Sequence, residues 1–218
     1  MKPYYEHAGI TIYHGDCREV LPEMESTDIV ITDPQYNVGM KYLGDADNMT
    51  RQGYICWCRS WFAKLMELSE RIVIFPGHRN LDVWWEIRKP SAIACWYKPG
   101  NPAHGGIFQF CEWEPILVWD EHCKAIGASD VFRATVTKQS DTGNHPCPKP
   151  ISLMMSLVKR MTRQEHWILD PFCGTGTTLI AAKRQHREAV GIEIEEKYCE
   201  IAAKRLSQEV LNFEGELK

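Results

Sequence analysis

The stretch HWILDPFCGTGTT, residues 166–178, decides the fold class of this chain. Its apolar start predicts a buried strand, and Gly174 and Gly176 predict a tight turn into a helix over residues 177–185. Glycines let the backbone approach a ligand, and a helix N-terminus favours negative charge. The stretch therefore predicts either a nucleotide-cofactor site at the end of a sheet strand or a strand-to-helix turn without a ligand.

Two details narrow the kind of cofactor. A later apolar run ends in Gly191-Ile192-Glu193, about 20 residues beyond the glycines, which is the spacing at which a carboxylate can bind ribose hydroxyls. Leu179 stands three residues after Gly176, where the dinucleotide fingerprint has its third glycine. This difference argues against NAD or FAD, and a dinucleotide oxidoreductase is therefore disfavoured.

A second string follows another buried strand near the start of the chain. The run Ile29-Val30-Ile31-Thr32 precedes Asp33-Pro34-Gln35-Tyr36, which we call the acid-proline string. Ligands of open α/β sheets bind beyond the carboxyl ends of the strands, so Asp33 is expected to project into a crevice. Acceptor oxygens beside the Tyr36 ring suit a planar heterocycle with an exocyclic amine. The alternative is that Asp-Pro only ends the strand and Tyr36 packs on the loop.

The rest of the chain alternates between strand and helix patterns. We expect further strands at residues 9–14, 71–75, 92–97, 115–119 and 189–194, and helices at residues 17–24, 51–68, 81–88, 151–161 and 196–206. This alternation is typical of an α/β fold with a doubly wound, mostly parallel sheet. We expect one domain over residues 1–218, with residues 98–141 as a variable segment inside it.

The composition favours a cytoplasmic globular protein. Hydrophobic residues make up 44% and charged residues 25% of the 218 residues, which is ordinary for that class. No apolar stretch approaches the ~20 residues that span a bilayer. Because no secretory signal is evident, we expect the nine cysteines to be reduced thiols. Cys56 and Cys58 lack the spacing of paired zinc ligands, and we expect no metal site.

Together the strings resemble the S-adenosylmethionine-dependent DNA amino-methyltransferases, which act on adenine N6 or cytosine N4. The chain matches that family's Asp-Pro-Phe-x-Gly-x-Gly string in full and its Asp-Pro-Pro-Tyr string at three of four positions. Residues 145–150, His-Pro-Cys-Pro-Lys-Pro, are similar to a His-Pro-Thr-Gln-Lys-Pro segment of the family, and Gly15-Asp16-Cys17 also fits. The order of the strings is that of the β-type permutation. The resemblance implies a Rossmann-like methyltransferase fold.

The resemblance also implies a mechanism. The target base would be extruded from the duplex, Asp33 and the Pro34 carbonyl would accept its two amine hydrogens, and Tyr36 would stack on it. Direct transfer makes positioning and electrostatic preorganisation the main sources of catalysis. The catalytic string would be Asp33, Pro34, Gln35 and Tyr36. The S-adenosylmethionine site would be formed by Asp16, His145, Lys149, Asp170, Phe172, Cys173, Gly174, Gly176, Thr177 and Glu193.

Gln35 departs from the family, which has a second proline there. It keeps a carbonyl but frees the backbone angle φ, so we expect an active enzyme that a Gln35→Pro change would make faster. A leading Asp favours adenine N6 as the target, and cytosine N4 or an RNA base is the alternative. A third hypothesis is a cofactor- or DNA-binding homologue in which Gln35 has weakened catalysis.

The expected partner is double-stranded DNA, with no membrane, in a bacterial or phage-encoded system. Because the net charge is -4, phosphates must be met by a local patch. The candidate contacts lie within residues 37–52 and 98–138 and are Arg51, Lys98, Arg133 and Lys138. For any single one of them, solvated surface charge is the preferred explanation. The recognition sequence is not determined, and a homodimer is left open.

Overall fold

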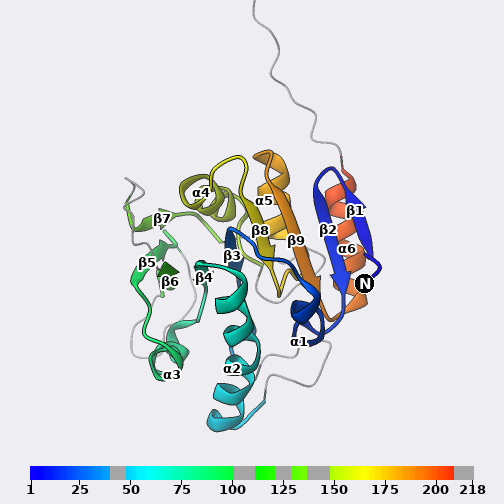
Figure 1. Ribbon diagram of the computed structural model, residues 1–218. Helices are drawn as coiled ribbons and strands as arrows, with labels where there is room; N and C mark the ends of the chain where they lie inside the picture. Colours follow the sequence, from blue (N-terminus) through cyan, green and yellow to red (C-terminus); the bar gives the residue numbers. More distant parts are fainter. Residues whose placement is uncertain (40–47, 101–110, 121–128, 137–147, 209–218) are drawn as a thin grey trace, which may run out of the picture.

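The computed structural model describes residues 1–39, 48–100, 111–120, 129–136 and 148–208 (Figure 1). The strands are β1 (Tyr5–His7), β2 (Ile10–His14), β3 (Ile29–Thr32), β4 (Arg71–Ile74), β5 (Ala92–Tyr97), β6 (Trp113–Asp120), β7 (Val131–Arg133), β8 (Trp167–Asp170) and β9 (Glu188–Glu193). The helices are α1 (Cys17–Val20), α2 (Arg51–Leu68), α3 (Leu81–Ile87), α4 (Ile151–Met161), α5 (Thr177–Arg184) and α6 (Glu196–Ser207), with 3-10 turns η1 (Leu21–Glu23) and η2 (His78–Asn80).

The strands form one sheet in the order β1-β2-β9-β8-β3-β4-β6-β5-β7. Neighbours from β2 through β9, β8 and β3 to β4 are parallel, whereas β6 is antiparallel to both β4 and β5, and β1 is antiparallel to β2. The expected doubly wound, mostly parallel α/β sheet is confirmed. Within the described part of the chain, no helix is long and apolar enough to cross a membrane.

Three elements differ from the sequence-based expectation. The three-residue strands β1 and β7 were not expected, because so short a run carries no readable periodicity. The helix expected over residues 17–24 is divided into α1 and η1, with a proline in the first turn of η1. The strand expected over residues 115–119 is present as β6, and its Ile116 and Leu117 are fully buried inside the segment 98–141. Part of that segment therefore belongs to the core of the sheet.

The sheet is covered on both faces, and β3 explains why its sequence is apolar throughout. All four of its residues are buried. Because side chains alternate along a strand, Ile29 and Ile31 face a cluster with α4, α5 and α6, whereas Val30 faces a cluster with α1, α2 and α3. Figure 1 shows β3 and β8 in the middle of this arrangement.

The fold positions a site at the junction of β3 and β8. These two strands are parallel neighbours, with Ile29 opposite Ile168 and Val30 opposite Leu169. The chain continues from β3 to β4 on one side of this pair and from β8 to β9 on the other. Such a reversal of winding direction opens a crevice at the carboxyl ends of the strands, where ligands bind in α/β sheets.

Candidate active site

A hydrogen bond joins the ends of the two central strands. The Thr32 hydroxyl at the end of β3 donates to Oδ1 of Asp170 at the end of β8 over 2.7 Å. The same oxygen accepts from the Phe172 N–H over 3.2 Å. Burial raises the pKa of Asp170 to about 6, against the stabilising hydroxyls of Thr178 and Thr32. The residue before the acid-proline string, Thr32, is therefore hydrogen-bonded to Asp170, the residue at which the glycine turn begins.

Packing inside the protein requires glycine at Gly176 of the turn and at Gly191 on the neighbouring strand β9. Gly176 has a φ of +79°, and a Cβ there would lie 2.9 Å from the Cβ of Ala202 on α6. At Gly191 on β9 a Cβ would lie 2.8 Å from Sγ of Cys173. The Cys173 side chain is thus buried between the turn and strand β9. The motif alone did not reveal this close packing against Ala202 and Cys173.

Glu193 at the end of β9 closes the glycine turn. Its Oε2 accepts from the Gly174 N–H over 2.8 Å, and its Oε1 accepts from the Glu195 N–H over 2.9 Å. Burial raises the pKa of Glu193 to about 7, although these backbone donors oppose the shift. Each carboxylate oxygen retains a second acceptor position, which fits it for ribose hydroxyls.

The other expected cofactor residues lie at the same edge of the sheet or beside it. The Phe172 ring packs against Trp61 and Trp57 of α2, with centroid distances of 4.9 and 5.6 Å. Thr177 is the first residue of α5 and is buried. Asp16 caps α1 after β2, accepts from the Arg18 N–H over 2.9 Å and forms an ion pair with the Arg18 guanidinium. His145 lies outside the described residues.

Lys149 contacts the acid-proline string directly. Its Nζ donates to Oδ2 of Asp33 over 2.6 Å and to the Tyr36 hydroxyl over 2.9 Å. The Tyr36 hydroxyl in turn donates to Oδ1 of Asp33 over 2.5 Å. Burial raises the pKa of Asp33, and the Lys149 ammonium is the strongest opposing influence. Lys149, expected in the cofactor site, thus serves as the counter-ion of Asp33 in this structure.

The backbone of the acid-proline string is held by two buried side chains that the sequence did not mark. The Tyr54 hydroxyl of α2 donates to the Gln35 carbonyl over 2.9 Å. The Asn80 amide of η2 donates to the carbonyls of Tyr36 and Pro76 over 2.8 and 3.1 Å. These bonds stabilise the turn at the position where the family has its second proline. No local motif identifies such distant partners.

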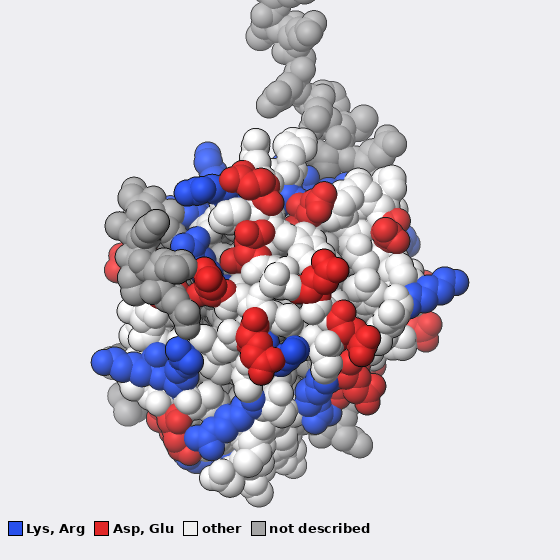
Figure 2. Space-filling model, in the orientation of Figure 1, with Lys and Arg blue, Asp and Glu red and all other residues white. Residues whose placement is uncertain are grey.

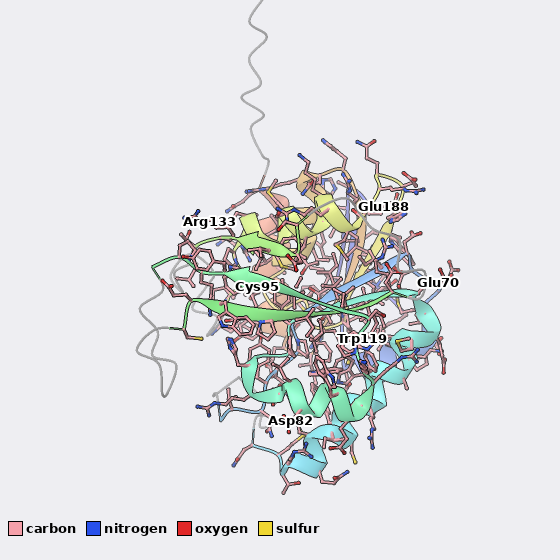
Figure 3. The ribbon with its side chains drawn as sticks, turned by 90° about the vertical axis from the view of Figure 1, so that its left-hand side faces the viewer. Glu70, Asp82, Cys95, Trp119, Arg133 and Glu188 are labelled. Carbon is pink, nitrogen blue, oxygen red and sulfur yellow. The ribbon has the colours of Figure 1, made fainter. Side chains whose placement is uncertain are left out.

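The three expected phosphate contacts that lie within the described residues do not form one surface. Lys98 is 5% exposed, and its Nζ lies 2.8 Å from Oε1 of Glu114, so the structure gives no support to Lys98 as a phosphate contact. Arg51 is exposed but pairs with acidic residues of α3 over 2.8 and 2.9 Å. Arg133 is exposed on β7, far from the labelled Asp82 of α3 in Figure 3. Lys138 lies outside the described residues.

Among the described residues on the face shown in Figure 2, no single basic patch is visible. Lys and Arg side chains are dispersed among acidic ones on that face. This agrees with the net charge of -4 and leaves local contacts as the means of meeting phosphates.

Comparisons with known proteins agree with this geometry. A family model described as DNA methylase, for the N6- and N4-specific enzymes, matches residues 82–204. The Type II methyltransferase M2.LlaDCHI of Lactococcus lactis subsp. cremoris is 41% identical over 95% of this chain and 93% of its own length.

Solved structures show the same fold. The cytosine-N4-specific PvuII DNA methyltransferase has a TM-score of 0.73 at 18% identity, over 95% of this chain and 90% of its own. M1.HpyAVI in complex with SAM has a TM-score of 0.67 at 24% identity, over 91% of this chain and 100% of its own. The family match and the close relative together show that the chain belongs to the DNA methylase family, the S-adenosylmethionine-dependent enzymes that its motifs resemble.

Proposed function

We propose that this DNA methylase transfers a methyl group from S-adenosylmethionine to adenine N6 in double-stranded DNA. The observation that carries the proposal is the 2.7 Å hydrogen bond from Thr32 to Asp170, which holds the acid-proline string directly beside the glycine turn. An acceptor for an amine and a turn for a cofactor thereby lie at the ends of neighbouring strands. The leading Asp33 is the reason for choosing adenine over cytosine.

The turn residues fit the proposed cofactor. Glu193 is a buried carboxylate with acceptor positions left for ribose hydroxyls, and Phe172 offers a ring supported by the aromatic side chains of α2. Gly174, Gly176 and Thr177 lead into α5, where a carboxylate would meet the helix N-terminus. S-adenosylmethionine supplies a methyl group made electrophilic by its sulfonium.

The acid-proline string positions the base. An extruded adenine lies against Tyr36, and its amine donates one hydrogen to Asp33 and the other to the Pro34 carbonyl. These acceptors orient the nitrogen lone pair toward the methyl group, and the Asp33 carboxylate stabilises the positive charge that develops on nitrogen. The amine nitrogen forms a bond to carbon while the carbon–sulfur bond breaks, and the methylated amine then loses one proton.

We further propose that residues 1–218 act as one domain and that residues 98–141 contribute DNA contacts outside their core strands. Arg133 supports this because it is exposed on β7 and packs against the Tyr97 ring at 5.7 Å. Arg51 would have to exchange its acidic partners on α3 for a phosphate. Removing each charge in turn should weaken DNA binding and reduce its salt dependence for a true contact.

The test is to incubate the protein with methyl-labelled S-adenosylmethionine and mixed-sequence duplex DNA, then identify the methylated nucleoside by mass. We expect N6-methyladenine. The matched control is Asp33→Asn, which keeps the shape but removes the charge, and should lower the rate by roughly 100-fold or more while cofactor affinity stays unchanged. N4-methylcytosine as the product would overturn the choice of base. If the protein binds the cofactor but transfers no methyl group to any DNA, and Gln35→Pro does not restore transfer, a cofactor- or DNA-binding homologue would be favoured.

A further inference from the structure

Four charged side chains, beginning with Asp33 of the acid-proline string, contact one another in series. Asp33 pairs with Lys149 over 2.6 Å, and Lys98 pairs with Glu114 over 2.8 Å. The two pairs meet where Nζ of Lys149 lies 3.9 Å from Oε2 of Glu114. The lysine side chains are 7% and 6% exposed, Glu114 is 19% exposed, and Asp33 is 24% exposed. The group is formally neutral, with two positive and two negative charges.

The proposed reaction conflicts with this resting arrangement. The amine of the base needs Asp33 as an acceptor, and its nitrogen becomes positively charged as the methyl group is added. The Lys149 ammonium already neutralises the Asp33 carboxylate at 2.6 Å. A second positive charge at the same carboxylate is repelled, and the repulsion is strong in a site shielded from water. Lys149 therefore needs another partner while the methyl group is transferred.

Glu114 on β6 offers that partner. Its Oε1 is bound to Lys98, whereas its Oε2 is buried and has no hydrogen-bond partner within the part of the chain that the structure describes. A buried carboxylate oxygen without a donor is costly, so it favours the approach of an ammonium group. A shift of about 1 Å would bring Nζ of Lys149 from 3.9 Å into hydrogen-bond range of Oε2.

Aromatic rings surround the ammonium along this short path. The Nζ atom of Lys149 lies 5.3 Å from the ring centroid of Tyr36, 5.1 Å from that of Phe75 and 5.9 Å from that of Trp96. Ring faces attract a cation without fixing it to one position. The flexible lysine side chain can then move between two carboxylates without ever losing its electrostatic partners.

We propose that Lys149 is a movable counter-ion, held on Asp33 at rest and received by Glu114 when the amine of the base binds Asp33. The inference rests on the proposed methyl transfer at Asp33. Glu114 and Lys149 are positioning residues: they determine when the charge of Asp33 is available, and they form no bond with the methyl group. Lys149 and then Lys98 oppose the effect of burial and lower the pKa of Glu114, and Lys98 also orients its carboxylate through the hydrogen bond to Oε1.

The charged groups around Asp33 and Glu114 determine how methyl transfer should depend on pH. The titratable groups that face the two carboxylates are Lys149, Lys98, Tyr36, His78 and, behind Asp33, Asp170. Burial raises the pKa of Asp33 and Lys149 opposes it, so loss of Lys149 should move the acidic limb of activity to higher pH. Loss of the Glu114 charge removes a like charge near Asp33 and leaves Lys149 in place, so it should not move that limb upward.

The experiment compares single-turnover methyl transfer in the wild type, Glu114→Gln, Lys149→Met and the double variant between about pH 6 and pH 9. Glu114→Gln should slow transfer about tenfold, because Lys149 stays on Asp33, with cofactor affinity unchanged. In the double variant at about pH 9, transfer should be faster than in Glu114→Gln, because no ammonium blocks an Asp33 that is now ionised. A merely structural role of Glu114 predicts no such rescue. Glu112→Gln, the same change two residues earlier, is the matched control and should behave like the wild type.

Two results would overturn the inference in an active enzyme. One is a Glu114→Gln rate within about twofold of the wild type, and the other is a double variant no faster than Glu114→Gln at high pH. If the wild type transfers no methyl group to any DNA, the proposed function fails first and the inference with it. The activity of the wild type therefore distinguishes the two failures.

Discussion

The two halves of the site are held together in different ways. In the glycine turn, bonds between close neighbours in the sequence combine with contacts to β9 and α6, the next strand and helix along the chain. Asp170 accepts from the Phe172 N–H, Glu193 accepts from the Gly174 N–H, and Gly176 packs closely against α6. In the acid-proline string, the partners are far apart in the sequence. Tyr54, Asn80 and Lys149 come from α2, η2 and the segment before α4.

This difference separates an element held by the chain that directly follows it from one held by remote segments. A turn whose partners lie in the strand and helices that directly follow it forms when that part of the chain folds. A string whose carbonyls are held by distant side chains has the right geometry only after the whole sheet has assembled. Damage to the turn should therefore affect folding and cofactor binding together, whereas damage to the distant partners should affect transfer more than cofactor binding.

The largest effect is expected from Gly176→Ala. The substitution places a side chain at a φ of +79° and a Cβ 2.9 Å from the Cβ of Ala202, which together should destabilise the protein by about 2 to 4 kcal/mol. Denaturant unfolding measures this loss, and cofactor binding should fall with it. Gly100→Ala is the control, because Gly100 has a φ of +69° but open space around it, and should cost only about 1 kcal/mol. Equal losses would show that packing against α6 is unimportant.

Asn80→Ala should have the next largest effect, on the other half of the site. It removes the donor to the Tyr36 and Pro76 carbonyls inside the protein, and should cost about 1 to 3 kcal/mol of stability. Methyl transfer should fall by more than cofactor affinity, as separate measurements of kcat and cofactor Kd would reveal. Tyr54→Phe, which loses only one bond to the string, should show a milder form of the same pattern. A parallel loss of cofactor affinity would contradict the proposed division.

Glu193 should make cofactor binding depend on pH. With its pKa raised to about 7 by burial, the carboxyl is largely protonated below that value and accepts ribose hydroxyls poorly. We expect cofactor affinity to increase about tenfold from pH 6 to pH 8. In the folded protein the protonated form is favoured, so the contribution of Glu193 to stability falls as pH rises from about 4.5 to about 7.

Calorimetric titration at several pH values measures this dependence. Glu193→Gln cannot ionise, and the variant should bind the cofactor weakly with little pH dependence. A wild-type affinity that is flat across the same range would exclude Glu193 as an ionised ribose acceptor.

The smallest effect is expected from Gln35→Pro. The Gln35 carbonyl is already held by Tyr54, and its N–H has no recorded partner among the described residues, so proline would lose no bond there. Its fixed φ would only preorganise the turn further, by less than about 1 kcal/mol. Single-turnover rates should therefore rise by a factor of a few. A rate equal to or below that of the wild type would show that Tyr54 already supplies the rigidity of the missing proline.

Local patterns were sufficient for most of the fold. The helices α2 and α4 have the bounds that periodicity predicted, because each presents a regular apolar face to a core, and β5 also has its expected bounds. The short edge strands β1 and β7 escaped prediction, since pairing with a neighbour rather than an apolar pattern defines them.

The same limit applies to the site. The motifs identified Asp33, Asp170 and Glu193, whose chemistry is visible in their neighbours along the chain. They did not identify Glu114 or Asn80, and they assigned Lys98 to a phosphate contact although its ammonium lies against Glu114. Charge alone does not tell whether a lysine is solvated or buried in an ion pair, because that depends on which strands become neighbours.

The sequence by itself determined the family, the α/β sheet and the two strings, because strand periodicity, glycine turns and acid-proline turns are properties of short segments. Only the tertiary structure decided that Lys149 pairs with Asp33 and lies 3.9 Å from Glu114. It also decided that the side chains of Tyr54 and Asn80 bind the backbone of the acid-proline string. The partners that hold the acid-proline string lie between 19 and 116 positions away from it in the chain. Packing of the sheet and its helices brings them together, and no short segment encodes that packing.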